Sequence, residues 1–254
     1  MLGARSLNSE KNLKDKKKKK PLFYNFCYDF VKITGAIPTL LWFRPKRYFP
    51  YGKKIPKGSV LISGNHRSLL DPVIVTVSFP GRRLHCLATK ELYNTKLKRA
   101  FFNQMHCIEV DKENFTLSAF HDVVSRLKDG CAVVIFPEGG LNRDKEDTLL
   151  AFKSGAVLMA HKSGAPILPI YIFKKEKWYQ RQHVVIGEPF DVSEYLGKIP
   201  TIDKLSEVSS ILRSKEIELR EYFESLPIHK KLTKNKNTDN TMQEQGEKKD
   251  EQKV

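Results

Sequence analysis

The chain has 254 residues, of which 40% are hydrophobic, which is enough to bury one sizeable core and does not require a second. Its 45 Lys and Arg residues outnumber its 29 Asp and Glu residues, and the formal net charge of +16 predicts an anionic partner: nucleic acid, an acidic membrane surface or a phosphorylated substrate. The four Cys residues stand far apart without a Cys-x-x-Cys pair, which argues against a disulfide framework or a zinc site.

Both ends of the chain are predicted to be disordered tails. Residues 1–20 carry eight basic and two acidic side chains, and residues 229–254 carry seven and five, with few large apolar residues in either tail. We therefore expect four parts: a basic tail at 1–20, a membrane-interfacial helical segment at 21–48, an α/β domain at 49–228 and a polar tail at 229–254.

Residues 22–43 are long enough to cross a bilayer, but they include Asp29, Lys32 and Pro38, which disfavour a spanning helix. Asn25, Asp29 and Lys32 follow the spacing i, i+4, i+7 and form one narrow polar stripe, while apolar side chains cover the rest of the helix. Basic residues flank the segment on both sides. The pattern predicts an amphipathic helix lying in a membrane interface, with a helix packed on the protein's own core as the alternative.

From residue 58 onward, short apolar runs alternate with helical patterns. The expected strands are 60–62, 84–88, 107–110, 132–136, 167–172 and 184–186, and the expected helices are 68–79, 114–128, 149–162 and 203–225. Strands alternating with helices predict an α/β fold with a largely parallel sheet flanked by helices. In such sheets ligands bind where the strands end, so the loops that follow the strands are where functional residues are expected.

His66 and Asp71 follow the first of these strands, in the segment Asn65-His-Arg-Ser-Leu-Leu-Asp71. Residues five apart do not stack on a regular helix, so a contact requires His66 to lie in the turn before it. If they meet, the carboxylate orients the imidazole and leaves its other nitrogen to accept a proton. The alternatives are a helix-capping Asp71 ahead of Pro72 and an ordinary hydrogen-bonded turn histidine.

This segment resembles the Asn-His-x4-Asp block of the glycerolipid acyltransferases, especially the bacterial 1-acyl-glycerol-3-phosphate acyltransferases. Four further stretches resemble blocks of the same family in the same order, over about residues 50–190: Thr89-Lys-Glu-Leu, Phe136-Pro-Glu-Gly-Gly, Phe152-Lys-Ser-Gly-Ala and Ala165-Pro-Ile-Leu-Pro-Ile. Several blocks in order identify the family far more specifically than one.

The resemblance implies direct acyl transfer from a thioester of coenzyme A or acyl carrier protein to the hydroxyl of lysophosphatidate, giving phosphatidate at the cytoplasmic face of an anionic membrane. His66 would be the general base, and Asp71 would orient it and support the imidazolium. We expect no metal, no further cofactor and no nucleic acid partner.

The substrate-binding candidates are Lys112, Glu138, Gly139, Gly140, Arg143, Lys90 and Lys153. Glu138 and the two glycines belong to the third block, where Gly140-Leu-Asn-Arg143 replaces the family's usual Thr-Arg-Ser or Thr-Ser-Arg. Lys112 stands where the family commonly has Arg, and a lysine lacks the planar fork of a guanidinium. These departures leave the identity of the acceptor open.

Three alternatives accompany the lysophosphatidate prediction. The acceptor could be glycerol 3-phosphate or another lysophospholipid. The chain could instead be a non-catalytic basic membrane or nucleic-acid binding module, although no helix-turn-helix, RNA-binding aromatic signature or zinc finger accompanies its charge. Ester or thioester hydrolysis lacks a Gly-x-Ser-x-Gly nucleophile. Four further histidines match no block and are expected to be structural or surface residues: His85, His106, His121 and His161.

Overall fold

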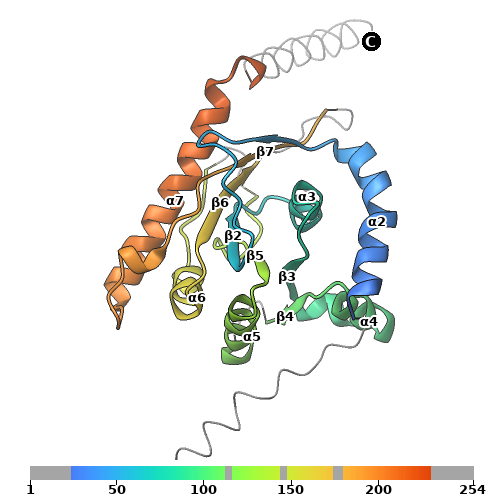
Figure 1. Cartoon of the computed structure of the whole chain (residues 1–254), viewed down its shortest axis with the longest axis horizontal. Helices are drawn as coiled ribbons and strands as arrows, with labels where there is room; N and C mark the ends of the chain where they lie inside the picture. Colours follow the sequence, from blue (N-terminus) through green and yellow to red (C-terminus); the bar gives the residue numbers. More distant parts are fainter. Residues whose placement is uncertain (1–23, 112–115, 144–147, 174–179, 230–254) are drawn as a thin grey trace, which may run out of the picture.

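The computed structural model describes residues 24–111, 116–143, 148–173 and 180–229. The tail predicted at 1–20 lies outside these ranges, as does the tail predicted at 229–254 except for its first residue. Within the described ranges the chain forms one sheet flanked by helices, and this confirms the predicted α/β class (Figure 1).

Seven strands form a mostly parallel sheet in the order β1-β7-β6-β2-β5-β3-β4. Strands β6, β2, β5, β3 and β4 run parallel to one another, while β7 pairs antiparallel with β6 and β1 pairs parallel with β7. Their bounds are β1 Lys46–Tyr48, β2 Val60–Gly64, β3 Leu84–Thr89, β4 Ile108–Val110, β5 Ala132–Ile135, β6 Ile167–Ile172 and β7 His183–Ile186. Strand β1 was not predicted and lies inside the segment expected to be helical.

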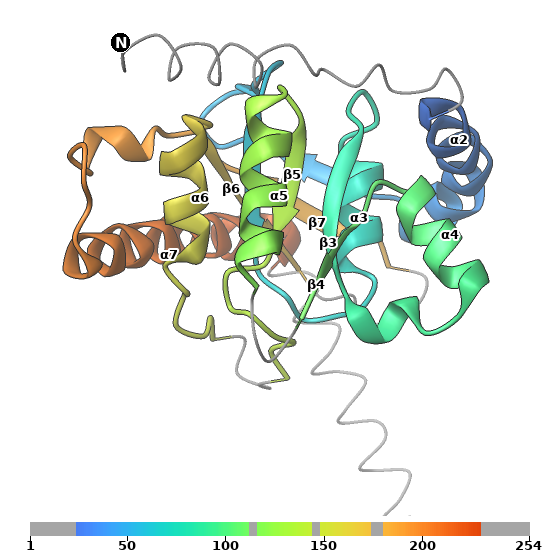
Figure 2. The same ribbon diagram turned by 90° about the horizontal axis from the view of Figure 1, so that it is seen from below.

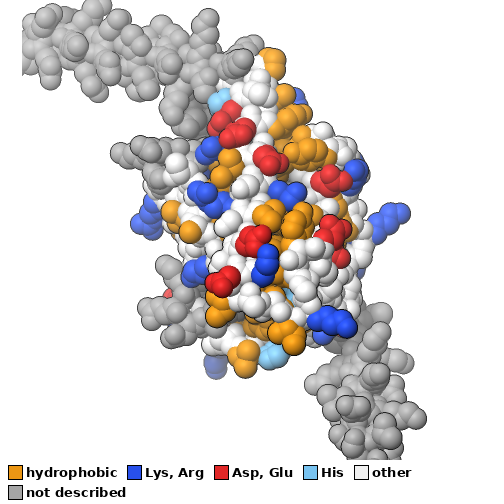
Figure 3. Space-filling model, turned by 90° about the vertical axis from the view of Figure 1, so that its left-hand side faces the viewer, with side chains coloured by type: hydrophobic (Ala, Val, Ile, Leu, Met, Phe, Trp, Pro, Cys, Tyr) orange, Lys and Arg blue, Asp and Glu red, His pale blue; other side chains and the backbone are white. Residues whose placement is uncertain are grey.

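Helices cover both faces of the sheet (Figures 1 and 2). Helices α5, α6 and α7 pack on one face, and α3 packs on the other, with α2 in contact with α3 and α4. In the part of the chain that the structure describes, the helices are α2 Tyr24–Phe43, α3 Asp71–Ser78, α4 Lys96–Gln104, α5 Leu117–Lys128, α6 Gly155–Ser163 and α7 Ile202–Ser225, with short 3₁₀ turns η1 Lys90–Tyr93 and η2 Val192–Glu194. Acidic and basic side chains are interspersed on the face that α7 covers (Figure 3).

Threonine side chains begin three of these helices by accepting hydrogen bonds from backbone N–H groups in the first turn. Thr95 caps α4, Thr116 caps α5 and Thr201 caps α7, with donor to acceptor distances of 3.2, 3.3 and 3.3 Å. The predicted helix at 114–128 therefore begins at Leu117 in the structure.

Two predicted helices begin later than expected because their first residues form loops at the edge of the sheet instead. The helix predicted at 68–79 begins at Asp71, since residues 65–70 form the turn after β2. The helix predicted at 149–162 begins at Gly155, since backbone N–H groups of the preceding stretch bond elsewhere: Leu150 N donates to the Glu138 carboxylate and Lys153 N donates to the Pro137 carbonyl.

Helix α2 turns its polar stripe toward the protein and most of its large apolar side chains outward. Asp29 pairs with Arg83 at 2.7 Å, and Lys32 Nζ donates to the Phe79 carbonyl at 3.3 Å. Tyr28 is buried beside them, and its hydroxyl accepts from Leu84 N at 2.9 Å. The exposed apolar residues of α2 are Phe26, Phe30, Ile33, Ile37, Leu40, Leu41 and Trp42. Of the helices in the described ranges, none combines the length and apolar character that crossing a bilayer requires.

Candidate active site

The loop that follows β2, residues 65–70, is fixed to the sheet at its first residue. Asn65 is buried, and its side chain forms two hydrogen bonds with the backbone of Ile172 on β6: Nδ2 donates to the carbonyl at 3.0 Å, and Oδ1 accepts from the N–H at 2.7 Å. Gly64 immediately before it packs so tightly on Ile170 that a Cβ there would lie 2.8 Å from that side chain. The next residue, His66, is thereby held at the carboxyl edge of the sheet.

Within this loop His66 and Asp71 meet. His66 Nδ1 lies 3.0 Å from Asp71 Oδ2. The same oxygen accepts from the N–H groups of Arg67 at 2.7 Å and Ser68 at 2.8 Å, so one carboxylate oxygen gathers three donors. The helix-capping alternative for Asp71 is wrong, because Leu70 occupies the N-cap position of α3 and no side chain caps the helix.

The imidazole of His66 is held on a second side by Phe136, which follows β5. The two ring centroids lie 4.2 Å apart, with an angle of 14° between the planes. The side chain of Asp71 is 3% exposed and that of His66 is 18% exposed, so the carboxylate is shielded while the imidazole keeps access to solvent. With Nδ1 directed at Asp71, Nε2 is the nitrogen left for a substrate.

Glu138 joins the Phe136-Pro-Glu-Gly-Gly block to the His66 loop. Its Oε1 accepts from His66 N at 2.9 Å, and its Oε2 accepts from Asn142 Nδ2 at 2.9 Å and Leu150 N at 3.1 Å. Asn142 closes the connection in the other direction, because its N–H donates to the His66 carbonyl at 2.6 Å. Glu138 is buried, and its protein partners make it a brace for the loop that carries His66.

Lys153 lies directly over the turn at Gly139. Gly139 has a φ of +73°, a conformation that favours glycine, and a Cβ built there would lie 2.6 Å from Lys153 Cε, so a larger residue would push the lysine side chain aside. A Cβ at Gly140 would meet nothing within 4 Å. An exposed ammonium group thus stands beside the turn whose Glu138 holds the His66 loop.

The other predicted substrate-binding residues lie in different surroundings. Lys90, just after β3, forms an ion pair with Asp111 at 2.6 Å. Arg143 is exposed in the loop after Asn142. Lys112 lies outside the described residues, so its prediction stays a prediction.

Sequence reasoning did not identify the supporting residues Asn142 and Glu216. Glu216, on α7, is fully buried, and its Oε1 accepts from the Ser63 hydroxyl on β2 at 2.7 Å. Burial raises the pKa of the Glu216 carboxyl well above its usual range, and the nearby Glu138 charge acts in the same direction. Its position four residues after Leu212 and three before Leu219, on the apolar face of the helix, was the available signal.

Residues 47–173 match a protein-family model described as Acyltransferase, and this stretch contains His66, Asp71, Glu138 and Lys153. The chain belongs to this acyltransferase family. In the structure, the bond from His66 N to Glu138 joins the block that contains His66 and Asp71 to the Phe136-Pro-Glu-Gly-Gly block.

The chain is related to bacterial lysophosphatidate acyltransferases. It is 27% identical over 212 residues to the 1-acyl-sn-glycerol-3-phosphate acyltransferase of Bacillus subtilis, which covers 80% of this chain and 100% of the relative. It is 29% identical to the enzyme of the same name from Borreliella burgdorferi, over 72% of this chain and 76% of the relative. The crystal structure of the 1-acyl-sn-glycerophosphate acyltransferase PlsC from Thermotoga maritima has the same fold, with a TM-score of 0.58 and 19% identity, over 88% of this chain and 89% of that one.

Proposed function

We propose that the chain transfers a fatty acyl group from an acyl thioester to the sn-2 hydroxyl of 1-acylglycerol 3-phosphate, giving phosphatidate. The observation that carries the proposal is the 3.0 Å contact between His66 Nδ1 and Asp71 Oδ2 at the carboxyl edge of the sheet, with Nε2 left available. The names of the two bacterial relatives support lysophosphatidate as the acceptor.

In this mechanism His66 Nε2 accepts the proton of the glycerol hydroxyl as the hydroxyl oxygen attacks the thioester carbonyl. The tetrahedral intermediate then expels the thiolate of coenzyme A or acyl carrier protein, and the thiolate takes the proton from the imidazolium. The Asp71 carboxylate stabilises the imidazolium between these two steps. General base catalysis of this kind contributes about 10²- to 10⁴-fold, and the remaining acceleration comes from holding both substrates in place.

Lys153 is proposed to bind the phosphate of the acceptor, with Arg143, Lys90 and Lys112 as further candidates. Its ammonium lies over Gly139, next to the turn that braces the His66 loop, where a phosphate would be close to the attacking hydroxyl. We expect Lys153→Gln to raise the KM for lysophosphatidate more than it lowers kcat. Lys162→Gln, an exposed lysine on α6, is the matched control. Equal kinetics for the two variants would remove Lys153 from the site.

An acceptor panel tests the reaction itself. Purified chain is incubated with labelled acyl-coenzyme A or acyl carrier protein and, separately, lysophosphatidate, glycerol 3-phosphate and lysophosphatidylcholine. We expect the fastest product formation with lysophosphatidate and its loss in His66→Ala. Faster transfer to one of the other acceptors would reassign the substrate, and no transfer to any of them would refute the enzyme proposal.

The chain is proposed to work on the cytoplasmic face of an anionic membrane, where acyl thioesters are available, with the outer side of α2 in the interface. The support is the row of exposed apolar side chains on α2, among them Phe30 at 58% and Ile37 at 64%. We expect Phe30→Asp to weaken flotation with anionic vesicles. Ile199→Asp, at a residue that is 90% exposed ahead of α7, should not. Unchanged flotation of Phe30→Asp would refute the proposed contact.

A further inference from the structure

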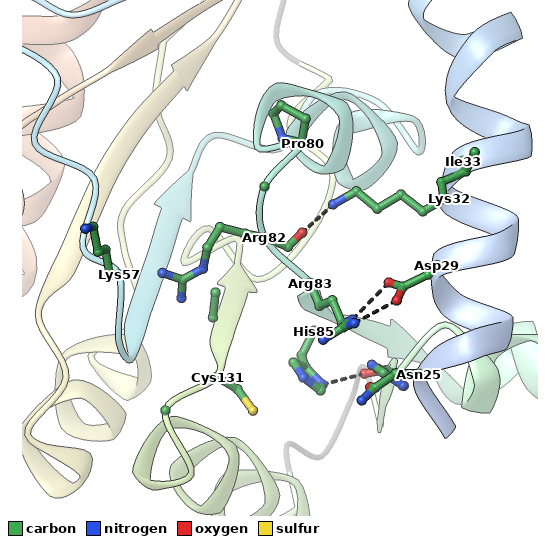
Figure 4. A pocket seen from close by; sticks show the side chains of 14 residues that line it. Asn25, Asp29, Lys32, Ile33, Lys57, Pro80, Arg82, Arg83, His85 and Cys131 are labelled. Carbon is green, nitrogen blue, oxygen red and sulfur yellow. Dashed lines mark hydrogen bonds and ion pairs between the residues drawn. The ribbon is translucent and has the colours of Figure 1, made fainter. Parts of the chain in front are cut away.

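The edge of the sheet opposite His66 encloses a second site. There the segments that lead into β2, β3 and β5, together with one side of α2, surround a cavity of about 730 Å³ (Figure 4). Lys57 precedes β2, Arg82 and Arg83 precede β3, and Cys131 precedes β5. His66 follows β2, so a strand length separates it from this cavity. The volume falls in the range of small-molecule sites, which is about 300–1,000 Å³.

Most of the charged side chains around the cavity are cationic. Lys32, Lys57, Arg82 and Arg83 line it, while Asp29 is the one carboxylate among the described lining residues. Arg83 donates to both oxygens of Asp29, at 2.9 and 2.7 Å, so these two charges neutralise each other. Three cations remain without a carboxylate to balance them within this lining.

Backbone carbonyls bind two of these cations, Arg82 and Lys32. The Arg82 guanidinium donates to the carbonyl of Pro56 and, at 2.5 Å, to that of Gly58, which fixes the segment carrying Lys57 beside it. Lys32 Nζ reaches across from α2 to the carbonyl of Arg82 itself (Figure 4). Burial lowers the pKa of both Lys32 and Arg82, because removing water disfavours their charged forms.

Neutral carbonyls accept some of the N–H donors of Lys32 and Arg82 but do not compensate their charge. Like charges gathered in a partly desolvated hollow repel one another and create a positive potential that an anion would offset. The guanidinium and ammonium groups suit phosphate oxygens in particular. The chemistry of the cavity therefore favours a phosphate group as its ligand.

The position of α2 distinguishes a lipid from other phosphate compounds. Ile33 lines the cavity and is 67% exposed, and it continues the apolar row formed by Phe26, Phe30 and Ile37 at helical spacing. A hydrocarbon surface thus borders the cationic hollow, an arrangement that fits a molecule with both a phosphate and acyl chains. The polar stripe noted in the sequence forms one wall of this cavity, with Asn25, Asp29 and Lys32 among its lining residues.

We propose that this cavity binds the phosphate group of an anionic phospholipid of the membrane surface, with the acyl chains along the exposed apolar row of α2. It is a second lipid site, separate from the one at His66. The inference rests on the membrane association proposed above and adds to it a defined site for one headgroup.

Hydrogen exchange of the full chain tests this site directly. Vesicles of phosphatidylcholine with phosphatidylglycerol should protect the backbone at 56–58 and 79–83 beyond the protection by phosphatidylcholine alone. In Lys57→Glu this added protection should disappear, and affinity for the anionic vesicles should fall roughly thirtyfold, since two units of charge change near the surface. Lys98→Glu, the same reversal on the exposed side of α4, should keep the added protection.

The outcomes separate the possible ligands. Loss of the added protection in both variants would indicate unspecific attraction and overturn the proposal, as would anionic vesicles that bind without protecting these segments. Protection by inorganic phosphate alone, or by single-stranded DNA, equal to that by the vesicles would assign the cavity to a soluble phosphate compound or a polynucleotide.

Acyl transfer to lysophosphatidate in neutral detergent micelles is measured alongside. Lys57→Glu should be as active as the unmodified chain there, because Lys57 lies at the opposite sheet edge from His66. An inactive unmodified chain would refute the proposed reaction while leaving the vesicle result on this cavity intact.

Discussion

Replacing Asp71 by Asn separates the charge of this residue from its hydrogen bonds. His66 Nδ1, Arg67 N and Ser68 N all approach the same carboxylate oxygen, Oδ2, at 2.7 to 3.0 Å. An amide with its oxygen in that place can accept all three bonds, so the loop should keep its structure. What is lost is the negative charge beside the imidazolium that forms during the proposed proton transfer.

The size of the effect follows from the geometry. Two unit charges about 4 Å apart attract by about 4 kcal/mol at the effective dielectric constant of about 20 that suits most protein sites. Because His66 is partly open to solvent, we expect about half to all of this, which corresponds to a fall in kcat of roughly 30- to 10³-fold. The unfolding free energy should change by less than about 1 kcal/mol.

Asp71→Ala provides the contrast, because it also removes the acceptor of the three hydrogen bonds. It should unfold at least about 2 kcal/mol more easily than Asp71→Asn, as measured by urea titration. Acyl transfer to lysophosphatidate gives the kinetic comparison, with Asp122→Asn, an exposed carboxylate on α5, as the control. An Asp71→Asn variant within threefold of the unmodified kcat would show that the charge is not used; one as unstable as Asp71→Ala would show that the amide cannot replace the carboxylate in the loop.

Three further predictions follow from neighbouring contacts. Gly139→Ala should raise the KM for lysophosphatidate, because a φ of +73° costs a non-glycine residue about 1–2 kcal/mol and the new Cβ displaces Lys153. Gly197→Ala, at a glycine where a Cβ meets nothing within 4 Å, should match the unmodified enzyme in the same assay. Glu216→Gln should be more stable than the unmodified protein in urea titrations at neutral pH. The raised pKa of the Glu216 carboxyl means that the unfolding free energy of the unmodified protein falls as pH rises above the usual value of 4.5, and the substitution removes that loss. A difference in unfolding free energy between the two proteins that does not widen with pH would contradict the assignment. Asn65→Ala should lower the unfolding free energy by roughly 2–4 kcal/mol, because both backbone groups of the facing β6 residue lose their partner, and a loss below about 1 kcal/mol would show that water replaces the side chain.

The class of fold could be predicted because its signals are local. The six expected strands all occur, since short β-branched runs bounded by turns are too short for helices and are typical of buried strands. Strand β1 and helix α4 were not predicted because their local signals are weak. β1 is only three residues long and has little apolar character, and α4 is rich in charged and polar residues and buries none of its side chains, so neither adds a segment to the buried core.

The candidate site could be predicted in part. Residues close in sequence, such as His66 and Asp71, reveal themselves by spacing and by the family blocks. The brace formed by Glu138 connects residues 72 apart, and the bond from Ser63 to Glu216 spans 153 residues. No pattern within one segment contains such a pairing, because it depends on which strands are neighbours in the sheet.

The amino-acid sequence by itself determined the family, the α/β class and the identity of the groups available for acyl transfer, since these depend on residue types at short spacing. Only the tertiary structure decided which way α2 faces. Helical periodicity defines a polar stripe and an apolar remainder, but it does not say which of them meets the protein. The apolar face of a soluble-protein helix usually points inward. Here Asp29 and Lys32 find partners at the amino edge of the sheet, so the polar stripe turns inward and the apolar row is left outside.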